Sequence, residues 1–240
     1  MVYLHGGGLV LGGLESHDDI CAEISAGTGF EVIAVDYRLA PEFLHPAAHE
    51  DALAVVTAVL AAGDPVVVAG DSAGATLAAS VALVLRQALA GHVLIYPGLG
   101  GDMTKGSYVR HAEAPMYSTR DVGYYRAIVA APGADLLADA TATPLAAADF
   151  SGLSPGFAVA AECDPLADDA RAWGERIVAA GGQGRWVEEP GLVHGYLRAR
   201  HSSVRAAASF RRIVAVIGRL GRGEGLPADE AQDSAGVHLA

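Results

Sequence analysis

The sequence predicts an α/β protein with a mostly parallel sheet, and three observations support this fold class. Short runs of β-branched residues alternate with longer alanine-rich stretches along most of the 240 residues. The runs are almost continuously apolar, as expected for strands that are buried on both faces. The chain is 52% hydrophobic and 18% charged, so it has enough apolar surface to form a core. Strand–helix alternation favours right-handed crossovers and therefore parallel strands.

The expected elements follow from these runs. Strands are expected at residues 1–4, 32–35, 66–68, 92–96, 157–161 and 185–187, and helices at 18–26, 46–62, 73–90, 168–180 and 203–220. Gly91 and Gly181 stand where glycine commonly ends a helix. Residues 100–150 break the alternation and are rich in tyrosine, which predicts an excursion over the sheet. Residues 221–240 are polar without an apolar period and are predicted to form a disordered tail.

Composition excludes several classes of function. The chain has 16 basic and 28 acidic residues, so its formal charge of −12 argues against a nucleic-acid partner. Its two cysteines, Cys21 and Cys163, form neither a disulfide framework nor a metal-binding spacing. No targeting segment begins the chain, and no uncharged stretch reaches the ~18 residues that cross a bilayer. We therefore expect a cytoplasmic protein that binds neither nucleic acid nor membrane.

The segment Gly70-Asp71-Ser72-Ala73-Gly74 matches the pattern G-x-S-x-G. It follows one predicted strand and opens a predicted helix, which is the context in which this pattern presents a nucleophilic serine. The sharp turn strains the serine backbone, and the flanking glycines let strand and helix pass closely. A glycine-rich turn that contains serine by chance is the alternative, and the strand-to-helix position favours the nucleophile.

A second glycine motif, His5-Gly6-Gly7-Gly8, follows the first predicted strand. Three consecutive glycines leave the backbone N–H groups free to face a ligand, and acyl transfer needs such donors where negative charge develops on a carbonyl oxygen. A flexible loop or a phosphate site are the alternatives. No Lys-Ser/Thr pair follows as in a P-loop, and no acidic residue completes a dinucleotide motif.

A serine nucleophile needs a base, and in proteins with this turn the chain order is serine, acid, histidine. Five histidines follow the serine: His92, His111, His194, His201 and His238. His194 is the preferred base because it lies in a turn just beyond the strand predicted at 185–187. An unrelated surface histidine and His201 are the alternatives.

Asp164 is the preferred acid. It directly follows the strand predicted at 157–161, and Pro165 prevents that strand from continuing. The other candidates are Glu162, Asp168 and Asp169. Glu162 is expected to point off the sheet, whereas the two aspartates are expected to begin the next helix, where carboxylates favour the helix dipole.

Together with Val35-Asp-Tyr-Arg-Leu-Ala-Pro-Glu42, Cys163-Asp-Pro-Leu166 and His194-Gly-Tyr196, these motifs resemble the hormone-sensitive-lipase family of α/β-hydrolases, which are carboxylesterases. The resemblance covers residues 1 to about 220 and implies one α/β-hydrolase domain over 1–220. It implies hydrolysis of short-to-medium acyl esters through an acyl-serine intermediate, with no cofactor or metal. It further implies nucleophile, base and acid at Ser72, His194 and Asp164, and an oxyanion hole from the N–H groups of Gly6, Gly7, Gly8 and Ala73.

The resemblance departs from the family at its front, since members carry a longer segment before the glycine motif. The chain therefore resembles a member without its first strands and part of its cap, and residues 103–132 would be the remaining part of that cap. In the family's strand order, the strand at 32–35 then becomes a sheet edge. An exposed edge favours pairing with another chain, so a homodimer through this edge is expected.

The substrate expected from this resemblance is a small-molecule ester. Pocket candidates are Tyr108, Met116, Tyr117, Tyr124, Tyr125, Tyr196 and Leu197, and among them we expect Tyr108, Tyr117, Tyr124 and Leu197 to contact substrate. Each of them would equally serve as a packing residue. Amidase, lactonase or deacetylase activity on the same triad stays open, as does a non-catalytic ligand-binding relative, although such relatives usually lack the base.

Overall fold

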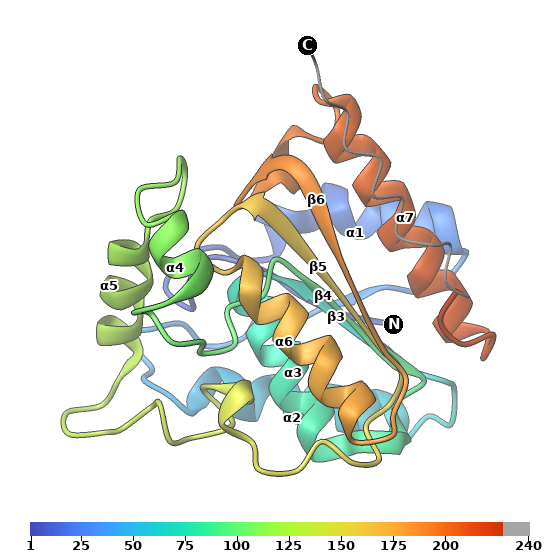
Figure 1. Cartoon of the computed structure of the whole chain (residues 1–240). Coiled ribbons are helices and arrows are strands. Elements are labelled where there is room, and N and C mark those ends of the chain that lie inside the picture. Colours follow the sequence, from blue (N-terminus) through green and yellow to red (C-terminus); the bar gives the residue numbers. More distant parts are fainter. Residues whose placement is uncertain (228–240) are drawn as a thin grey trace.

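A computed structural model describes residues 1–227, which contain a six-stranded sheet (Figure 1). The strand order is β2-β1-β3-β4-β5-β6, and every neighbouring pair is parallel. The strands are β1 (Val2–Leu4), β2 (Ile33–Ala34), β3 (Val67–Asp71), β4 (Gly91–Ile95), β5 (Gly156–Cys163) and β6 (Gly184–Val193). The predicted fold class is confirmed, and the two-residue β2 lies at a sheet edge, as expected.

Helices cover both faces of this sheet (Figure 1). They are α1 (Leu14–Thr28) and α7 (Val204–Gly221) on one face, and α2 (Ala47–Leu60), α3 (Ala73–Leu85) and α6 (Ala167–Ala179) on the other. Side chains alternate along the central strands, so that Val68 packs towards α3 while Val67 and Ala69 pack towards α1 and α7. Short 3₁₀ turns lie at Arg86–Ala88, Pro144–Ala146 and Tyr196–Ala199. Each central strand is buried on both faces, which explains its unbroken apolar sequence.

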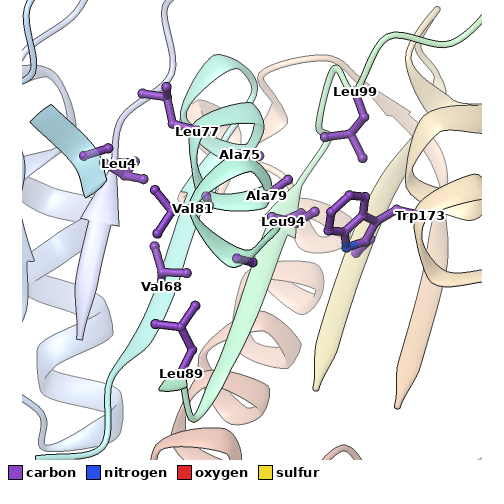
Figure 2. Packing of buried hydrophobic residues seen from close by; sticks show 14 of the residues in the cluster. Leu4, Val68, Ala75, Leu77, Ala79, Val81, Leu89, Leu94, Leu99 and Trp173 are labelled. Atoms are coloured by element: carbon purple, nitrogen blue, oxygen red, sulfur yellow. The ribbon is translucent and has the colours of Figure 1, made fainter. Parts of the chain in front are cut away.

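The core on the α3 side contains a fully buried tryptophan (Figure 2). The indole N–H of Trp173 donates to Nε2 of His92 at 2.9 Å, and Nδ1 of His92 lies 3.1 Å from the Ser154 hydroxyl. Burial lowers the pKa of His92 to about 3, so this imidazole is neutral and serves as a hydrogen-bond partner within the core. Truncating a buried tryptophan typically costs about 3–5 kcal/mol.

Several element boundaries differ from the expectation, and those of β6, α3 and β4 are the most informative. β6 extends to Val193 instead of ending near residue 187, because an edge strand tolerates polar residues and Pro190. α3 ends at Leu85, where Arg86 adopts φ +48°, instead of continuing to residue 90. Gly91 is therefore the first residue of β4 and caps no helix. The other glycine prediction is confirmed, since the N–H groups of Gly181 and Gly182 close the end of α6 on Val178 and Ile177.

Between β4 and β5 the chain leaves the two helical layers. This segment carries α4 (Gly106–Arg110) and α5 (Thr119–Val129), both within the expected excursion at 103–132. The Ser118 hydroxyl and the Asp121 carboxylate each accept a backbone N–H from the other residue and so cap the start of α5. Of the predicted tail, residues 228–240 lie outside the described residues. Within residues 1–227, no helix is long and apolar enough to cross a membrane.

Candidate active site

Ser72 occupies the sharp turn between β3 and α3. Its backbone has φ +53° and ψ −119°, a conformation that typically costs about 1–3 kcal/mol in a residue with a side chain. The neighbouring glycines make the turn sterically feasible. A Cβ atom on Gly74 would lie 2.0 Å from the Leu4 carbonyl oxygen, and one on Gly70 would lie 2.6 Å from the same atom. The motif glycines are therefore required by the close passage of α3 over β1.

The structure brings Ser72, His194 and Asp164 together. Oγ of Ser72 lies 2.8 Å from Nε2 of His194, and Nδ1 of the same ring lies 2.7 Å from Oδ2 of Asp164. A carboxylate can only accept a hydrogen bond, so Nδ1 carries the ring proton, and Nε2 is left to accept from the serine hydroxyl. The acid is fully buried and the histidine nearly so. This arrangement can remove a proton from the serine as the oxygen attacks.

Each member of this group follows the carboxyl end of a different strand, namely β3, β5 or β6. His194 lies in the turn directly after β6, as predicted, although that strand is longer than predicted. The competing acids have other partners. Glu162 is exposed and accepts the Gly191 N–H, while Asp168 and Asp169 lie in the first turn of α6.

The remaining histidine candidates lie away from Ser72. His92 is buried in β4, His201 is exposed and paired with Glu23, and His111 caps α4. His238 falls outside the described residues. Aromatic rings instead flank the imidazole of His194. Tyr117 stacks on it at a centroid distance of 4.4 Å, and Tyr96 meets it edge-on at 4.9 Å. The two rings restrict the orientation of the imidazole.

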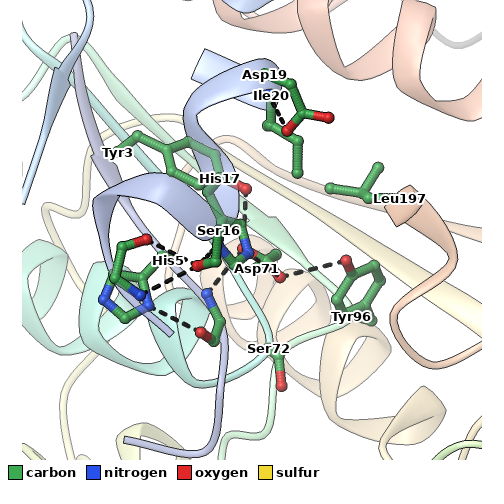
Figure 3. Close-up of polar contacts among 12 residues, drawn as sticks. Tyr3, His5, Ser16, His17, Asp19, Ile20, Asp71, Ser72, Tyr96 and Leu197 are labelled. Carbon is green, nitrogen blue, oxygen red and sulfur yellow. Dashed lines mark hydrogen bonds and ion pairs between the residues drawn. The ribbon is translucent and has the colours of Figure 1, made fainter. Parts of the chain in front are cut away.

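The glycine loop is anchored to the serine turn through Asp71 (Figure 3). The Gly6 N–H donates to Oδ1 of Asp71 at 3.0 Å, so this donor is already used, which differs from the expected oxyanion role. The N–H groups of Gly7, Gly8 and Ala73 donate no hydrogen bond to any residue within 1–227. Gly8 and Ala73 line the same cavity as Ser72. The N–H groups of Gly8 and of Ala73, the first residue of α3, are thus available at the cavity beside the serine.

Asp71 is a buried carboxylate at the centre of a polar network. It accepts from the Tyr3 hydroxyl at 2.9 Å and the Tyr96 hydroxyl at 3.3 Å, and Nε2 of His17 lies 3.2 Å from Oδ1. Burial by itself would raise the pKa of Asp71, but the hydrogen bond and charge of His17, together with Tyr3 and the Gly6 N–H, lower it overall. The carboxylate therefore stays ionised and holds the glycine loop against the serine turn.

A cavity of about 110 Å³ opens beside Ser72. Tyr108 and Tyr117 line it, as expected, and so does Tyr125. Tyr124 does not line it, because its side chain is 64% exposed on the outer face of α5. Leu197 does not line it either. That residue is fully buried in the core beneath α7, and Figure 3 shows it well away from the Ser72 hydroxyl. Met116 is 77% exposed.

Comparison with known proteins agrees with this geometry. A family model described as alpha/beta hydrolase fold matches residues 1–198. Carboxylesterase NlhH from Mycobacterium tuberculosis is 38% identical over 212 residues, which cover 82% of this chain and 66% of the relative. Ethyl acetate hydrolase from Pseudomonas putida is 34% identical over 210 residues, which cover 82% of this chain and 66% of the relative. An esterase structure from Pyrobaculum calidifontis superposes with a TM-score of 0.85 at 31% identity, over 91% of this chain and 76% of the other.

The chain belongs to the hormone-sensitive-lipase-like α/β-hydrolases. The family resemblance seen in the motifs is thereby confirmed, and the relatives that the chain matches are ester hydrolases. The chain spans about two thirds of the length of the curated relatives named above.

Sequence reasoning missed several polar residues around this candidate site. Asp71 stood inside the serine motif, but the pattern leaves that position open. His45 and Arg126 both line the cavity and were not singled out, because neither belongs to a motif. Arg126 had one usable signal, since it shares a helical face with Val122 and Val129.

The described residues also hold one cluster with the geometry of metal ligands, made of Asp19, Glu23 and His201. The Arg200 guanidinium already pairs with both carboxylates of this cluster. The cluster lies apart from the residues that line the cavity, so nothing connects it to the chemistry at Ser72.

Proposed function

We propose that this chain hydrolyses small carboxylic esters with short-to-medium acyl chains through an acyl-serine intermediate. The observation that carries the proposal is the continuous hydrogen-bonded path from the Ser72 hydroxyl through the His194 ring to the buried Asp164 carboxylate. The same residues occur in the motifs of a family whose members named above are ester hydrolases.

In the proposed reaction, Oγ of Ser72 attacks the ester carbonyl while Nε2 of His194 takes the hydroxyl proton. The carbonyl oxygen becomes an oxyanion, and the N–H groups of Gly7, Gly8 and Ala73 donate to it. The alkoxy group leaves with the proton from His194, which produces the alcohol and the acyl-serine. Water then repeats the sequence as nucleophile, and it releases the carboxylic acid and restores the serine.

Asp164 acts through the histidine. Its carboxylate fixes the ring proton on Nδ1 and stabilises the imidazolium that forms during each proton transfer. It also accepts the Leu166 N–H at 2.9 Å, so its position is set by the turn that begins α6. Gly6 has a positioning role in this scheme, because its N–H holds the glycine loop to Asp71.

The preference for small esters rests on the modest volume of the cavity and on its aromatic wall. The name of one relative, ethyl acetate hydrolase, points to the same substrate size. An amide is tested as a separate substrate, since the same triad chemistry applies to it.

The test is hydrolysis of p-nitrophenyl acetate, butyrate and octanoate by the wild-type chain and by Ser72→Ala. The amide substrate is p-nitroacetanilide. We expect the wild type to cleave the acetate and butyrate fastest, and Ser72→Ala to lower kcat by several orders of magnitude, about 10⁴-fold or more. Ser202→Ala is the matched control, because its exposed hydroxyl lies outside the site. Equal rates for Ser72→Ala and wild type would refute the nucleophile. A folded wild type that cleaves none of these substrates would instead favour a ligand-binding relative.

A further inference from the structure

One face of α5 forms a wall of the cavity beside Ser72. The residues on this face are Val122, Tyr125, Arg126 and Val129, which all line the cavity and follow the i, i+3, i+4, i+7 spacing of one helical stripe. Three of them are apolar or aromatic, as are half of the other lining residues. Arg126 is therefore a cationic side chain placed on an otherwise hydrophobic wall.

Arg126 forms no ion pair with any residue within 1–227. The one hydrogen bond of its side chain there runs from Nη1 to the sulfur of Met103 at 3.6 Å. A thioether is a weak acceptor, whereas an arginine fork matches a carboxylate well. Arg38 and Arg200 show the contrast, because each pairs with two carboxylates. The guanidinium of Arg126 thus has unused capacity for an anion.

The guanidinium lies beside residues that line the cavity. Its partner Met103 packs against Tyr108, Val122 and Leu166, which line the cavity. Burial raises the pKa of Tyr117, the nearby Asp164 charge raises it further, and the Arg126 charge acts in the opposite direction. The charge of Arg126 therefore reaches the ring that stacks on His194. A long arginine often extends its head into bulk water, and these contacts argue against that arrangement here.

We propose that Arg126 binds a carboxylate carried by the substrate, so that the preferred esters are half-esters of short dicarboxylic acids or similar acidic esters. This inference rests on the proposed ester hydrolysis and adds the substrate class. A formal charge of −12 repels anions from the molecule as a whole. A preference for an anionic ester must therefore arise locally, and Arg126 is the unpaired cation on the cavity wall among the described residues.

The test compares each acidic ester with a neutral ester of the same acyl length: monoethyl succinate with ethyl butyrate, monoethyl glutarate with ethyl pentanoate, and monoethyl adipate with ethyl hexanoate. Hydrolysis is measured by pH-stat titration at pH 7.5. The measured quantity is the ratio of kcat/KM for each acidic ester to that of its neutral counterpart. We expect Arg126→Gln to lower this ratio about tenfold or more, and Arg126→Lys to lower it less. Arg120→Gln is the matched control, since Arg120 is exposed on the same helix, and it should leave the ratio unchanged. An unchanged ratio in Arg126→Gln overturns the proposal.

A binding measurement separates this inference from the proposed reaction. Calorimetric titration of the wild-type chain with glutarate should show binding that Arg126→Gln weakens about tenfold or more, whether or not any ester is cleaved. No glutarate binding together with neutral-ester hydrolysis refutes the anion site and leaves the esterase standing. Glutarate binding without hydrolysis of any ester supports the anion site and refutes the esterase.

Discussion

Asp169, in the first turn of α6, allows a test of how burial makes the stability of this chain depend on pH. The side chain is 1% exposed, and a single oxygen, Oδ2, accepts the N–H groups of Leu99, Gly100 and Gly101 and the Tyr108 hydroxyl at 2.7–3.3 Å. Replacement by asparagine can place its carbonyl oxygen where Oδ2 lies. All four hydrogen bonds then keep an acceptor while the negative charge is removed.

The expected change in stability follows from the pKa of Asp169. Burial raises the pKa of Asp169 from 3.8 to about 6, against the opposing effect of its hydrogen bonds. Because the folded state holds the proton more tightly than the unfolded chain, ionisation costs stability as the pH rises from about 4 to 6. The full difference is about 3 kcal/mol, of which about 1–2 kcal/mol falls between pH 5 and 7. The new amide N–H₂ of asparagine needs partners and costs about 1–3 kcal/mol, but that cost does not vary with pH.

The assay is urea unfolding at pH 5, 6 and 7, followed by tryptophan fluorescence. The wild type should lose about 1–2 kcal/mol more stability than Asp169→Asn between pH 5 and 7. Asp168→Asn is the control. Burial would raise the pKa of Asp168, but the Ser107 N–H and Arg110 lower it overall, so it is ionised in both states above pH 5. The difference in unfolding free energy between Asp168→Asn and wild type should be the same at pH 5 and 7. Parallel pH curves for wild type and Asp169→Asn would refute the reasoning.

Three further substitutions test the site and its support. Asp71→Asn removes a buried carboxylate, and it should cost about 3–5 kcal/mol in urea unfolding at pH 7 and lower kcat. Because the pKa of Asp71 is depressed, the stability difference from wild type should shrink below pH 4, and a difference of the same size there would contradict this. Gly74→Ala places a Cβ 2.0 Å from the Leu4 carbonyl and should abolish folding, so a native circular dichroism spectrum would contradict the close packing. Tyr117→Ala should lower kcat/KM for p-nitrophenyl butyrate about tenfold, whereas Tyr124→Ala should not; equal effects would mean that α5 faces the cavity differently.

The fold was predictable because its central strands are buried on both faces and its helices are long and regular. The boundaries of β6 and α3 were not predictable, for two different reasons. β6 is an edge strand whose residues 188–191 are two glutamates, a proline and a glycine, so this part of its sequence does not stand out from a loop. The end of α3 has no signal either, because alanine and leucine continue past Leu85 and the chain turns at Arg86 through an unusual backbone conformation.

The candidate triad was predictable because strand ends and chain order restrict each residue to a few positions. The cavity wall was not, since neighbouring residues on a helix point about 100° apart. Tyr124 and Tyr125 are equivalent in sequence, yet one faces solvent and the other lines the cavity. Which face of α5 turns inward depends on tertiary packing. The same limit applies to Gly6, whose N–H is occupied by a carboxylate 65 positions away in the chain.

The placement of α5 has a consequence for protein engineering. Its four inward positions, at residues 122, 125, 126 and 129, lie on one short helix that supplies none of the three residues of the proton-transfer path. A combinatorial library confined to these four codons would vary the shape and charge of the cavity beside Ser72 without changing Ser72, His194 or Asp164. Selection from such a library on different esters would change which molecules are accepted without redesigning the chemistry.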